Sequence, residues 1–270
     1  MKIIHLSDLH IGYVAGKWNC ENRARAIVGS ILEKCTPAND YIVAITGDIV
    51  DKGNNHKQVN SALDIISALN NGGIRCIILP GNHDYGSGLG ISIKHQIYFK
   101  NLFYGNANEE FPRLTIFDQT AFISLDSLQG EFDLSGNILS GIDDLTGGAD
   151  GAIGPNQLTR LRTILASEQV KSCIYTVVML HHHPIYKAAG FLELKDSKSL
   201  VSVLEEFDID MLLFGHKHGG DELTSRWGIP RIYDGGSSTG KDMEIPSLIR
   251  VFDLSKPPGH YSSIPWQIPT

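Results

Sequence analysis

Residues 41–48 are Tyr-Ile-Val-Ala-Ile-Thr-Gly-Asp, and residues 75–84 are Arg-Cys-Ile-Ile-Leu-Pro-Gly-Asn-His-Asp. Each stretch begins with a short apolar run, of the length and composition of a buried β-strand. The first run ends at Thr46-Gly47 and the second at Pro80-Gly81, and polar side chains follow each glycine. Between the two stretches, apolar residues from 59 to 69 recur at helical spacing. Strand, helix and strand in this order predict parallel strands with a helix packed against the sheet.

The same alternation extends outward in both directions. Toward the N-terminus, a strand is predicted at residues 2–7 and a helix at 20–35. Toward the C-terminus, strands are predicted at 114–117, 121–125, 174–180, 211–214, 229–233 and 248–252, and helices at 157–165 and 197–206. We therefore expect one α/β domain over residues 1–270, with a glycine-rich surface insertion at about 129–155 and an irregular tail at about 255–270.

The composition is that of a globular protein with an acidic balance. Hydrophobic residues make up 42% of the 270 residues, and the net charge is −7. This charge argues against a broad basic surface and so against nucleic acid as a partner. A phosphate substrate would need a local positive source, which bound metal ions can supply. The chain opens directly on a strand pattern, and no apolar run reaches the roughly 18 residues that span a membrane. We expect a cytoplasmic protein without membrane contact.

Five polar clusters follow the ends of five predicted strands. They are Asp8-Leu9-His10, Gly47-Asp48, Gly81-Asn82-His83-Asp84, His181-His182-His183-Pro184 and Gly215-His216-Lys217-His218. Ligands of open α/β sheets bind beyond the carboxyl ends of the strands, so we expect the clusters to converge there. Carboxylate and imidazole ligands together suit divalent Mn, Fe, Co, Ni or Zn. Two such ions roughly 3.5–4 Å apart can stabilise the attacking and leaving oxygens of a phosphoryl displacement.

In this order, the clusters resemble the motif pattern of calcineurin-like metallophosphoesterases. The resemblance runs from Asp8 to His218 and covers most of the chain. The size and the histidines before Pro184 make the chain most similar to compact bacterial class III cyclic-nucleotide and glycerophosphodiester phosphodiesterases. The resemblance implies a four-layer αββα sandwich of two mixed β-sheets with helices on the outer faces. It also implies a binuclear metal-dependent phosphoesterase, acting on a small phosphodiester or a phosphomonoester by in-line attack of a hydroxide between the metals.

The resemblance further implies a role for each matching residue. Seven residues are expected to hold two divalent ions: Asp8, His10 and His218 for one, Asn82, His181 and His216 for the other, and Asp48 for both. His83 would not bind metal but would face the substrate, where it would stabilise phosphoryl charge or protonate the leaving oxygen. Asp84 would orient it by a hydrogen bond.

Several assignments stay open at this point. His181 is chosen as the ligand by its place after the strand, and His182 takes that role if the strand ends one residue later. His182 and Trp18 are candidates for contact with the substrate, and Arg231 is expected to be an ordinary surface charge. A nuclease of the same family and a non-catalytic metal-binding scaffold are the alternative functions. The native metals and a homo-oligomeric state are not determined by these patterns.

Overall fold

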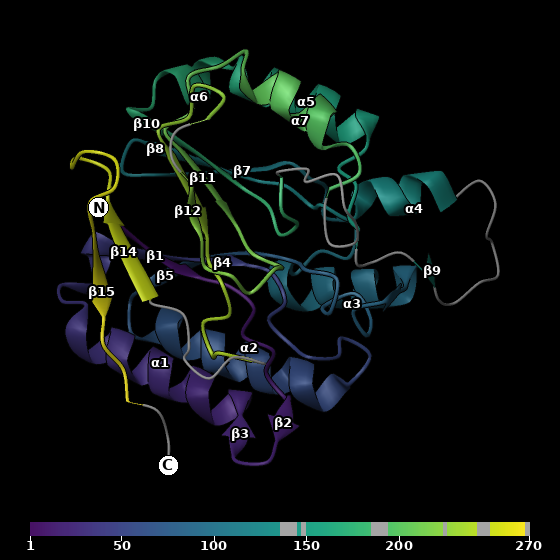
Figure 1. Cartoon of the computed structure of the whole chain (residues 1–270), viewed down its shortest axis with the longest axis vertical. Coiled ribbons are helices and arrows are strands. Elements are labelled where there is room, and N and C mark those ends of the chain that lie inside the picture. Colours follow the sequence, from purple (N-terminus) through teal and green to yellow (C-terminus); the bar gives the residue numbers. More distant parts are fainter. Residues whose placement is uncertain (136–144, 147–149, 185–193, 224–225, 242–248, 268–270) are drawn as a thin grey trace.

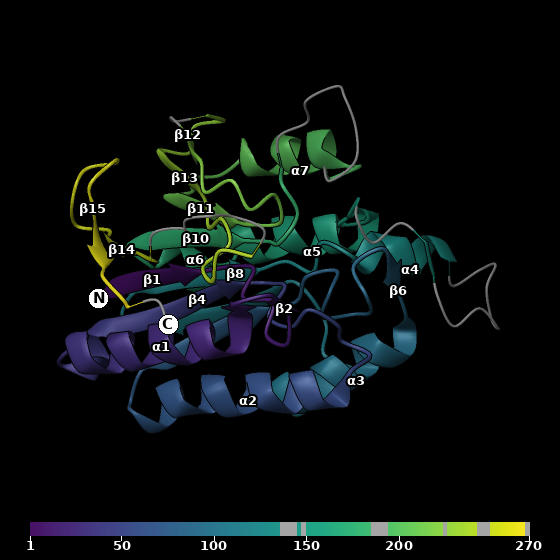
Figure 2. The ribbon, with the colours of Figure 1, turned by 60° about the horizontal axis from the view of Figure 1, so that its bottom comes forward.

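The structure, a computed structural model, describes the chain except residues 136–144, 147–149, 185–193, 224–225, 242–248 and 268–270. Two β-sheets pack face to face, with α1 and α2 on one outer side and α5 and α7 on the other (Figure 1 and Figure 2). The expected four-layer αββα sandwich is therefore confirmed. Within the described residues, no helix is long and apolar enough to cross a membrane.

The first sheet supplies three of the polar clusters. Its strands lie in the order β15 (Tyr261–Ile264), β14 (Ile249–Asp253), β1 (Lys2–Leu6), β4 (Tyr41–Thr46) and β5 (Arg75–Leu79). The strands β1, β4 and β5 are parallel, so their carboxyl ends lie at one edge. The outer face is covered by α1 (Cys20–Lys34) and α2 (His56–Asn71), while α3 (Ile93–Tyr104) lies beside α2.

The second sheet supplies the other two clusters. Its strands lie in the order β12 (Glu222–Leu223), β13 (Arg231–Asp234), β11 (Met211–Phe214), β10 (Tyr175–Met179), β8 (Thr120–Ser124) and β7 (Arg113–Phe117). Here β8, β10, β11 and β13 run parallel to one another, and the edge strands β7 and β12 pair antiparallel with them. Three helices contribute to the outer core: α5 (Pro155–Leu165), α6 (Glu168–Lys171) and α7 (Ser197–Leu204).

The central strands are apolar throughout because both of their faces are buried. In β4, Val43 and Ile45 pack with the helices of the first outer layer, whereas Ile42 and Ala44 pack between the two sheets. Because both faces are buried, apolar and polar residues do not alternate along these strands in the sequence. It also holds their carboxyl ends, and the loops that follow, in fixed register.

Short elements complete the described part of the chain. They are β2 (Val14–Ala15), β3 (Trp18–Asn19), the 3-10 turn Ala38–Asp40, β6 (Gly90–Ile91), α4 (Gln129–Ser135) and β9 (Leu145–Thr146). The turn between β7 and β8 has positive φ angles at Asp118 and Gln119, 44° and 63°, so the predicted hairpin is confirmed.

Three regions differ from the sequence prediction. The helix α3 was not predicted. Its residues Ile93 and Ile97 are 48% and 44% exposed, so the apolar residues of this segment do not mark a single buried face. The tail is not irregular throughout, because β15 pairs antiparallel with β14. The proposed insertion begins with the helix α4, and residues 136–144 and 147–149 of it lie outside the described part.

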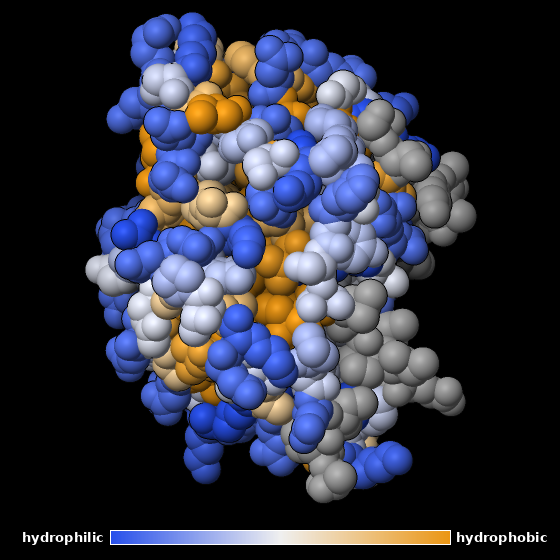
Figure 3. Space-filling model, turned by 90° about the vertical axis from the view of Figure 1, so that its left-hand side faces the viewer, coloured by the Kyte–Doolittle hydropathy of each residue, from blue (hydrophilic) through white to orange (hydrophobic). Residues whose placement is uncertain are grey.

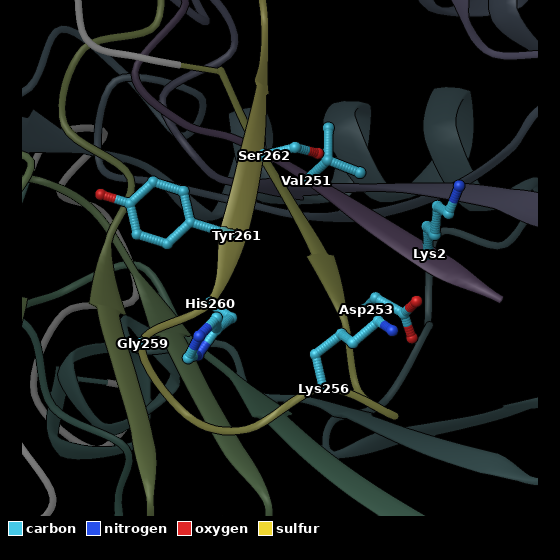
Figure 4. Close-up of a pocket in the computed structure, with 8 residues that line it drawn as sticks. All are labelled: Lys2, Val251, Asp253, Lys256, Gly259, His260, Tyr261 and Ser262. Atoms are coloured by element: carbon cyan, nitrogen blue, oxygen red, sulfur yellow. The ribbon is translucent and has the colours of Figure 1, made fainter.

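One hollow on the outer surface lies apart from the strand ends that carry the polar clusters. The face shown in Figure 3 is largely hydrophilic, with a narrow apolar strip near its middle. A hollow of about 520 Å³ lies between β1, β14 and β15. Figure 4 shows Lys2, Asp253, Lys256 and Tyr261 among the residues that line it. Lys2 begins β1, whereas Asp8 follows its other end, so this hollow lies away from the polar clusters.

Candidate metal centre

Asp8, His10 and His218 form the first group of ligand atoms. Asp8 Oδ1 lies 3.4 Å from His218 Nε2 and 3.9 Å from His10 Nε2, and the two Nε2 atoms are 3.0 Å apart. The other carboxylate oxygen of Asp8 accepts hydrogen bonds from Ser7 Oγ and from the His216 backbone N–H. Oδ1 is buried and has no hydrogen-bond partner. Because an unpaired buried carboxylate oxygen is costly, this atom fits a bound cation.

Asn82, His181 and His216 form the second group. His181 Nε2 lies 3.1 Å from Asn82 Oδ1 and 3.1 Å from His216 Nδ1. The side-chain amide of Asn82 donates to the Gly88 carbonyl, which turns its oxygen toward His181. His181 Nδ1 donates to the Thr46 carbonyl at 2.7 Å, which leaves Nε2 with a lone pair for a metal.

Asp48 lies between the two groups. Its Oδ1 is 3.4 Å from His181 Nε2, and its Oδ2 is 3.7 Å from His10 Nε2. Asp48, His181 and His216 can share one ion, and Asp48 also groups with His10 and His83. A carboxylate with one oxygen toward each group has the geometry of a bridging ligand.

The structure places His181, and not His182, among these atoms. The ring of His182 is turned to Ser127, with its Nδ1 2.7 Å from Ser127 Oγ, and lies 4.3 Å from the ring of His216. The indole of Trp18 stacks on the guanidinium of Arg23 at 3.7 Å. The substrate contacts expected for His182 and Trp18 therefore stay predictions.

Burial and mutual contact shift the pKa values of several candidate ligands. Burial would raise the pKa of Asp48, but His181, His83 and His10 outweigh it and hold this pKa well below its usual range. Burial lowers the pKa of His10 and of His216 well below the usual value. For His181, burial is outweighed by Asp48, and the pKa rises to about 9. The ionised Asp48 and the neutral His10 and His216 are the forms that a metal requires, whereas His181 must release a proton when an ion binds.

Backbone strain is concentrated in this centre. Five of the seven candidate ligands have left-handed φ angles: Asp8 at 50°, His10 at 44°, Asp48 at 49°, His216 at 78° and His218 at 57°. A non-glycine residue in this conformation is disfavoured by roughly 1–2 kcal/mol, and such residues cluster at functional sites. In these loops the backbone departs from its lowest-energy conformation, and the side chains of the candidate ligands point toward one centre.

The glycines of the motifs have a packing role. A side chain at Gly81 would collide with the Asp48 carboxylate, and one at Gly215 would collide with Ser7 Oγ and the Asp8 carboxylate. The Gly-Asn-His and Gly-His-x-His patterns therefore need glycine because a carboxylate from another loop occupies the Cβ position.

His83 lies beside the centre. Its backbone N–H donates to Asp48 Oδ1 at 2.9 Å, and its Nδ1 donates to the Asp51 carbonyl at 2.6 Å. Its ring packs edge-on against the ring of His10, with 4.7 Å between centroids. A ring held through Nδ1 has Nε2 left for contact with a substrate.

The prediction that Asp84 orients His83 by a hydrogen bond is wrong. The buried Asp84 carboxylate accepts instead from the backbone N–H groups of Ile49, Val50 and Gly81, at 2.8–3.2 Å. Burial and the nearby Asp48 raise the pKa of Asp84 to about 7, although these hydrogen bonds oppose the rise. Asp84 therefore ties the loop that carries Asp48 to the loop that carries Asn82.

Replacing Asp84 by alanine is expected to lower the free energy of unfolding by roughly 2–4 kcal/mol, because three buried N–H groups lose their acceptor. Urea unfolding of the metal-free protein measures this loss. Asp64→Ala, an exposed site on α2, is the matched control and should change stability by less than about 0.5 kcal/mol. Equal stability of the two variants would contradict the tying role.

Several residues near the centre were missed by sequence reasoning. Asp51 approaches His10, with its Oδ1 3.8 Å from His10 Nδ1, and pairs with Lys241 at 3.0 Å. Asp51 stands three residues after Asp48, and that proximity was the only signal in the sequence.

The prediction that Arg231 is an ordinary surface charge is wrong. Arg231 is buried, and its guanidinium donates to the Leu254 and Lys256 carbonyls.

A four-layer sandwich whose parallel strand ends gather two groups of carboxylate, amide and imidazole ligands defines a metal-dependent hydrolase of the dimetal phosphoesterase class. The sequence model of the calcineurin-like phosphoesterases matches residues 1–220, and the chain belongs to this family. It is therefore a hydrolase that acts on phosphoester bonds.

Individual relatives agree with this class. The chain is 24% identical over 227 residues to a probable cyclic nucleotide phosphodiesterase of Vesicomyosocius okutanii subsp. Calyptogena okutanii (strain HA), covering 82% of this chain and 80% of that protein. It is 32% identical to the DNA double-strand break repair protein Mre11 of Nanoarchaeum equitans (strain Kin4-M), over 97 residues that make up 35% of this chain and 27% of that protein. A dimetal phosphatase from Danio rerio shares the fold, with a TM-score of 0.60, 15% identity and 86% of each chain covered.

Proposed function

We propose that this protein is a binuclear phosphodiesterase that hydrolyses a small phosphodiester of the cyclic-nucleotide or glycerophosphodiester type. The observation that carries the proposal is the position of Asp48, which presents one oxygen to each of two groups of ligand atoms. Two divalent ions at this centre, Mn, Fe, Zn, Co or Ni, would neutralise phosphate charge and make hydroxide available near neutral pH.

The protein's own residues would hold and orient the reacting groups. Asp8, His10 and His218 would bind one ion, Asn82, His181 and His216 the other, and Asp48 both. The orphan oxygen of Asp8 supports this arrangement, because it is buried and needs a positive partner.

His83 would serve as the proton donor. Its backbone N–H donates to Asp48 and its Nδ1 to Asp51, so the ring is held beside the metal centre, where it would stay outside the coordination of the ions. A proton held on Nε2 would pass to the oxygen of the departing alcohol. In this role the Asp51 carbonyl orients His83, as Asp84 was first expected to do.

Two observations support a small substrate. The similar phosphodiesterase covers most of the chain, whereas the match to Mre11 covers about a third of it. The net charge of −7 gives no general attraction for a polyanionic strand. The Mre11 match nevertheless makes a nuclease the second candidate, and DNA belongs in the same assay.

Purified protein with Mn²⁺ should be assayed on cyclic AMP, a glycerophosphodiester, bis-(p-nitrophenyl) phosphate, p-nitrophenyl phosphate and DNA. We expect kcat/KM for one of the small diesters to exceed that for the monoester and for DNA by at least about tenfold, a difference of about 1.4 kcal/mol. Faster cleavage of DNA would favour the nuclease. Binding of two Mn²⁺ ions without hydrolysis of any substrate would favour the non-catalytic scaffold.

A further inference from the structure

A second hollow, of about 530 Å³, lies on the side of the molecule that carries α3 and α4 (Figure 1). It is lined by one face of α3, by residues 107–111 of the loop that follows, and by Gln129 of α4 and Asn156 and Arg160 of α5. Among the described residues that line it, none is a candidate metal ligand. The hollow is therefore a feature separate from the metal centre.

The face of α3 that lines the hollow reverses the usual pattern of burial. Its members share one side of the helix because they are spaced i, i+3, i+4 and i+7, and they are Ile93, Gln96, Ile97 and Lys100. The two isoleucines are exposed, whereas Lys100 is only 6% exposed. In most proteins isoleucine is buried and lysine is in water. A ligand in the hollow would cover the isoleucines and could reach the lysine.

The ammonium of Lys100 has no hydrogen-bond or ion-pair partner in the described part of the chain. It lies 5.5 Å from the centre of the Phe111 ring, which lines the same hollow. The buried Asp126 carboxylate attracts it from a distance, but the Asp126 oxygens accept hydrogen bonds from the Tyr85 hydroxyl and the Leu128 N–H. Because a lysine held out of water without an acceptor is costly, a ligand oxygen would be a favourable partner.

The other charged groups at the hollow are paired. Glu109 pairs with Arg113 at 2.6 Å, and Glu110 pairs with Arg160 at 2.9 Å. The Nε of Arg160 is buried and has no hydrogen-bond partner, so this guanidinium has a donor to spare. Two glutamates are thus balanced by two arginines, and the positive charge of Lys100 remains. A ligand with a single negative charge matches this balance.

From these observations we propose that the hollow binds a small organic acid, with its carboxylate held by Lys100 and its apolar body packed on Ile93 and Ile97. A volume of about 530 Å³ is in the range of small-molecule sites, which combine apolar walls with a few placed polar groups. A hydrogen bond between two charged groups supplies specificity, and the covered isoleucines supply apolar burial. The site lies apart from the proposed phosphodiesterase centre and does not depend on its activity.

The test uses the full chain in the presence of Zn²⁺, with hexanoate as the probe and the NMR signals of isotope-labelled isoleucine methyl groups as the readout. We expect hexanoate to shift the signals of Ile93 and Ile97 and to saturate with a Kd of about 1 mM or lower. Hexanol keeps the apolar body without the charge and should bind at least about tenfold more weakly. Equal binding of hexanol, or saturation by inorganic phosphate in place of hexanoate, would overturn the proposed ligand class.

Variants of α3 separate the contribution of the charge from that of the apolar wall. Lys100→Met should weaken hexanoate binding at least about tenfold and leave hexanol binding unchanged, because only the charged contact is lost. Lys94→Met is the matched control: Lys94 is exposed on the same helix and is not among the residues that line the hollow, so hexanoate should bind as to wild type.

Ile97→Ser, at an exposed position, should weaken hexanoate and hexanol alike, and it decides the case if Lys100→Met does not fold. Unchanged hexanoate affinity in Lys100→Met, as for a carboxylate bound at the metal centre, would overturn the proposal. The same holds for unchanged affinity in Ile97→Ser, or for wild-type protein in which hexanoate shifts neither Ile93 nor Ile97.

Discussion

Asp48→Ala is expected to remove both bound metal ions and to lower kcat/KM on the order of 10³-fold or more, at least the size of losing one preorganised electrostatic contact. The Asp48 carboxylate lies 3.4 Å from His181 Nε2 and 3.7 Å from His10 Nε2, so it belongs to both groups of ligand atoms. Without it, the remaining proposed ligands are four imidazoles, one amide and a single carboxylate, that of Asp8. Metal content by elemental analysis and steady-state hydrolysis of bis-(p-nitrophenyl) phosphate measure the two effects.

Asp48→Asn is the control for packing. It keeps the shape of the side chain and one oxygen, so a loss similar to that of alanine would identify the charge as the decisive property. The variant should also be examined by circular dichroism, because Asp48 accepts the His83 backbone N–H. Full activity and full metal content in Asp48→Ala would exclude the bridging role.

The second large effect is expected at His83. His83→Ala should retain both metal ions and lose about 10²–10⁴-fold in kcat on an alkyl phosphodiester, the usual contribution of a general acid. The loss should be much smaller on bis-(p-nitrophenyl) phosphate, because p-nitrophenolate departs without a proton. This dependence on the leaving group distinguishes proton donation from electrostatic binding of the phosphate.

His56→Ala provides the matched comparison for His83→Ala. His56 is exposed at the start of α2 and packs against Tyr98, so its loss should change neither metal content nor kcat. The result that would reassign His83 is the loss of one metal ion, since its ring also lies within reach of an ion shared with His10 and Asp48. Equal losses on both substrates would remove it from the role of acid.

Much of the layered fold was predictable from local patterns. The apolar runs at residues 41–46 and 75–79 are strands, and their short length and the Gly or Pro-Gly that follows favour a strand over a helix in the sequence. Alternation with helices then predicts parallel pairing and a common edge for the polar clusters. The helix α3 and the strand β15 were missed because α3 exposes two isoleucines and β15 depends on pairing with β14.

The order of strands and motifs along the chain is enough to predict which residue types follow the strand ends, because each motif comes directly after an apolar run. Which atoms come into contact depends on long-range packing between loops that are far apart in the chain. Asp84 binds the amides of Ile49 and Val50 instead of His83, and His181 rather than His182 joins Asn82. Lys241 and His10 are 231 positions apart and meet at 3.4 Å. The physical reason is that left-handed turns and packed loops aim these side chains, and neither the turns nor the distant partners leave a local pattern in the sequence.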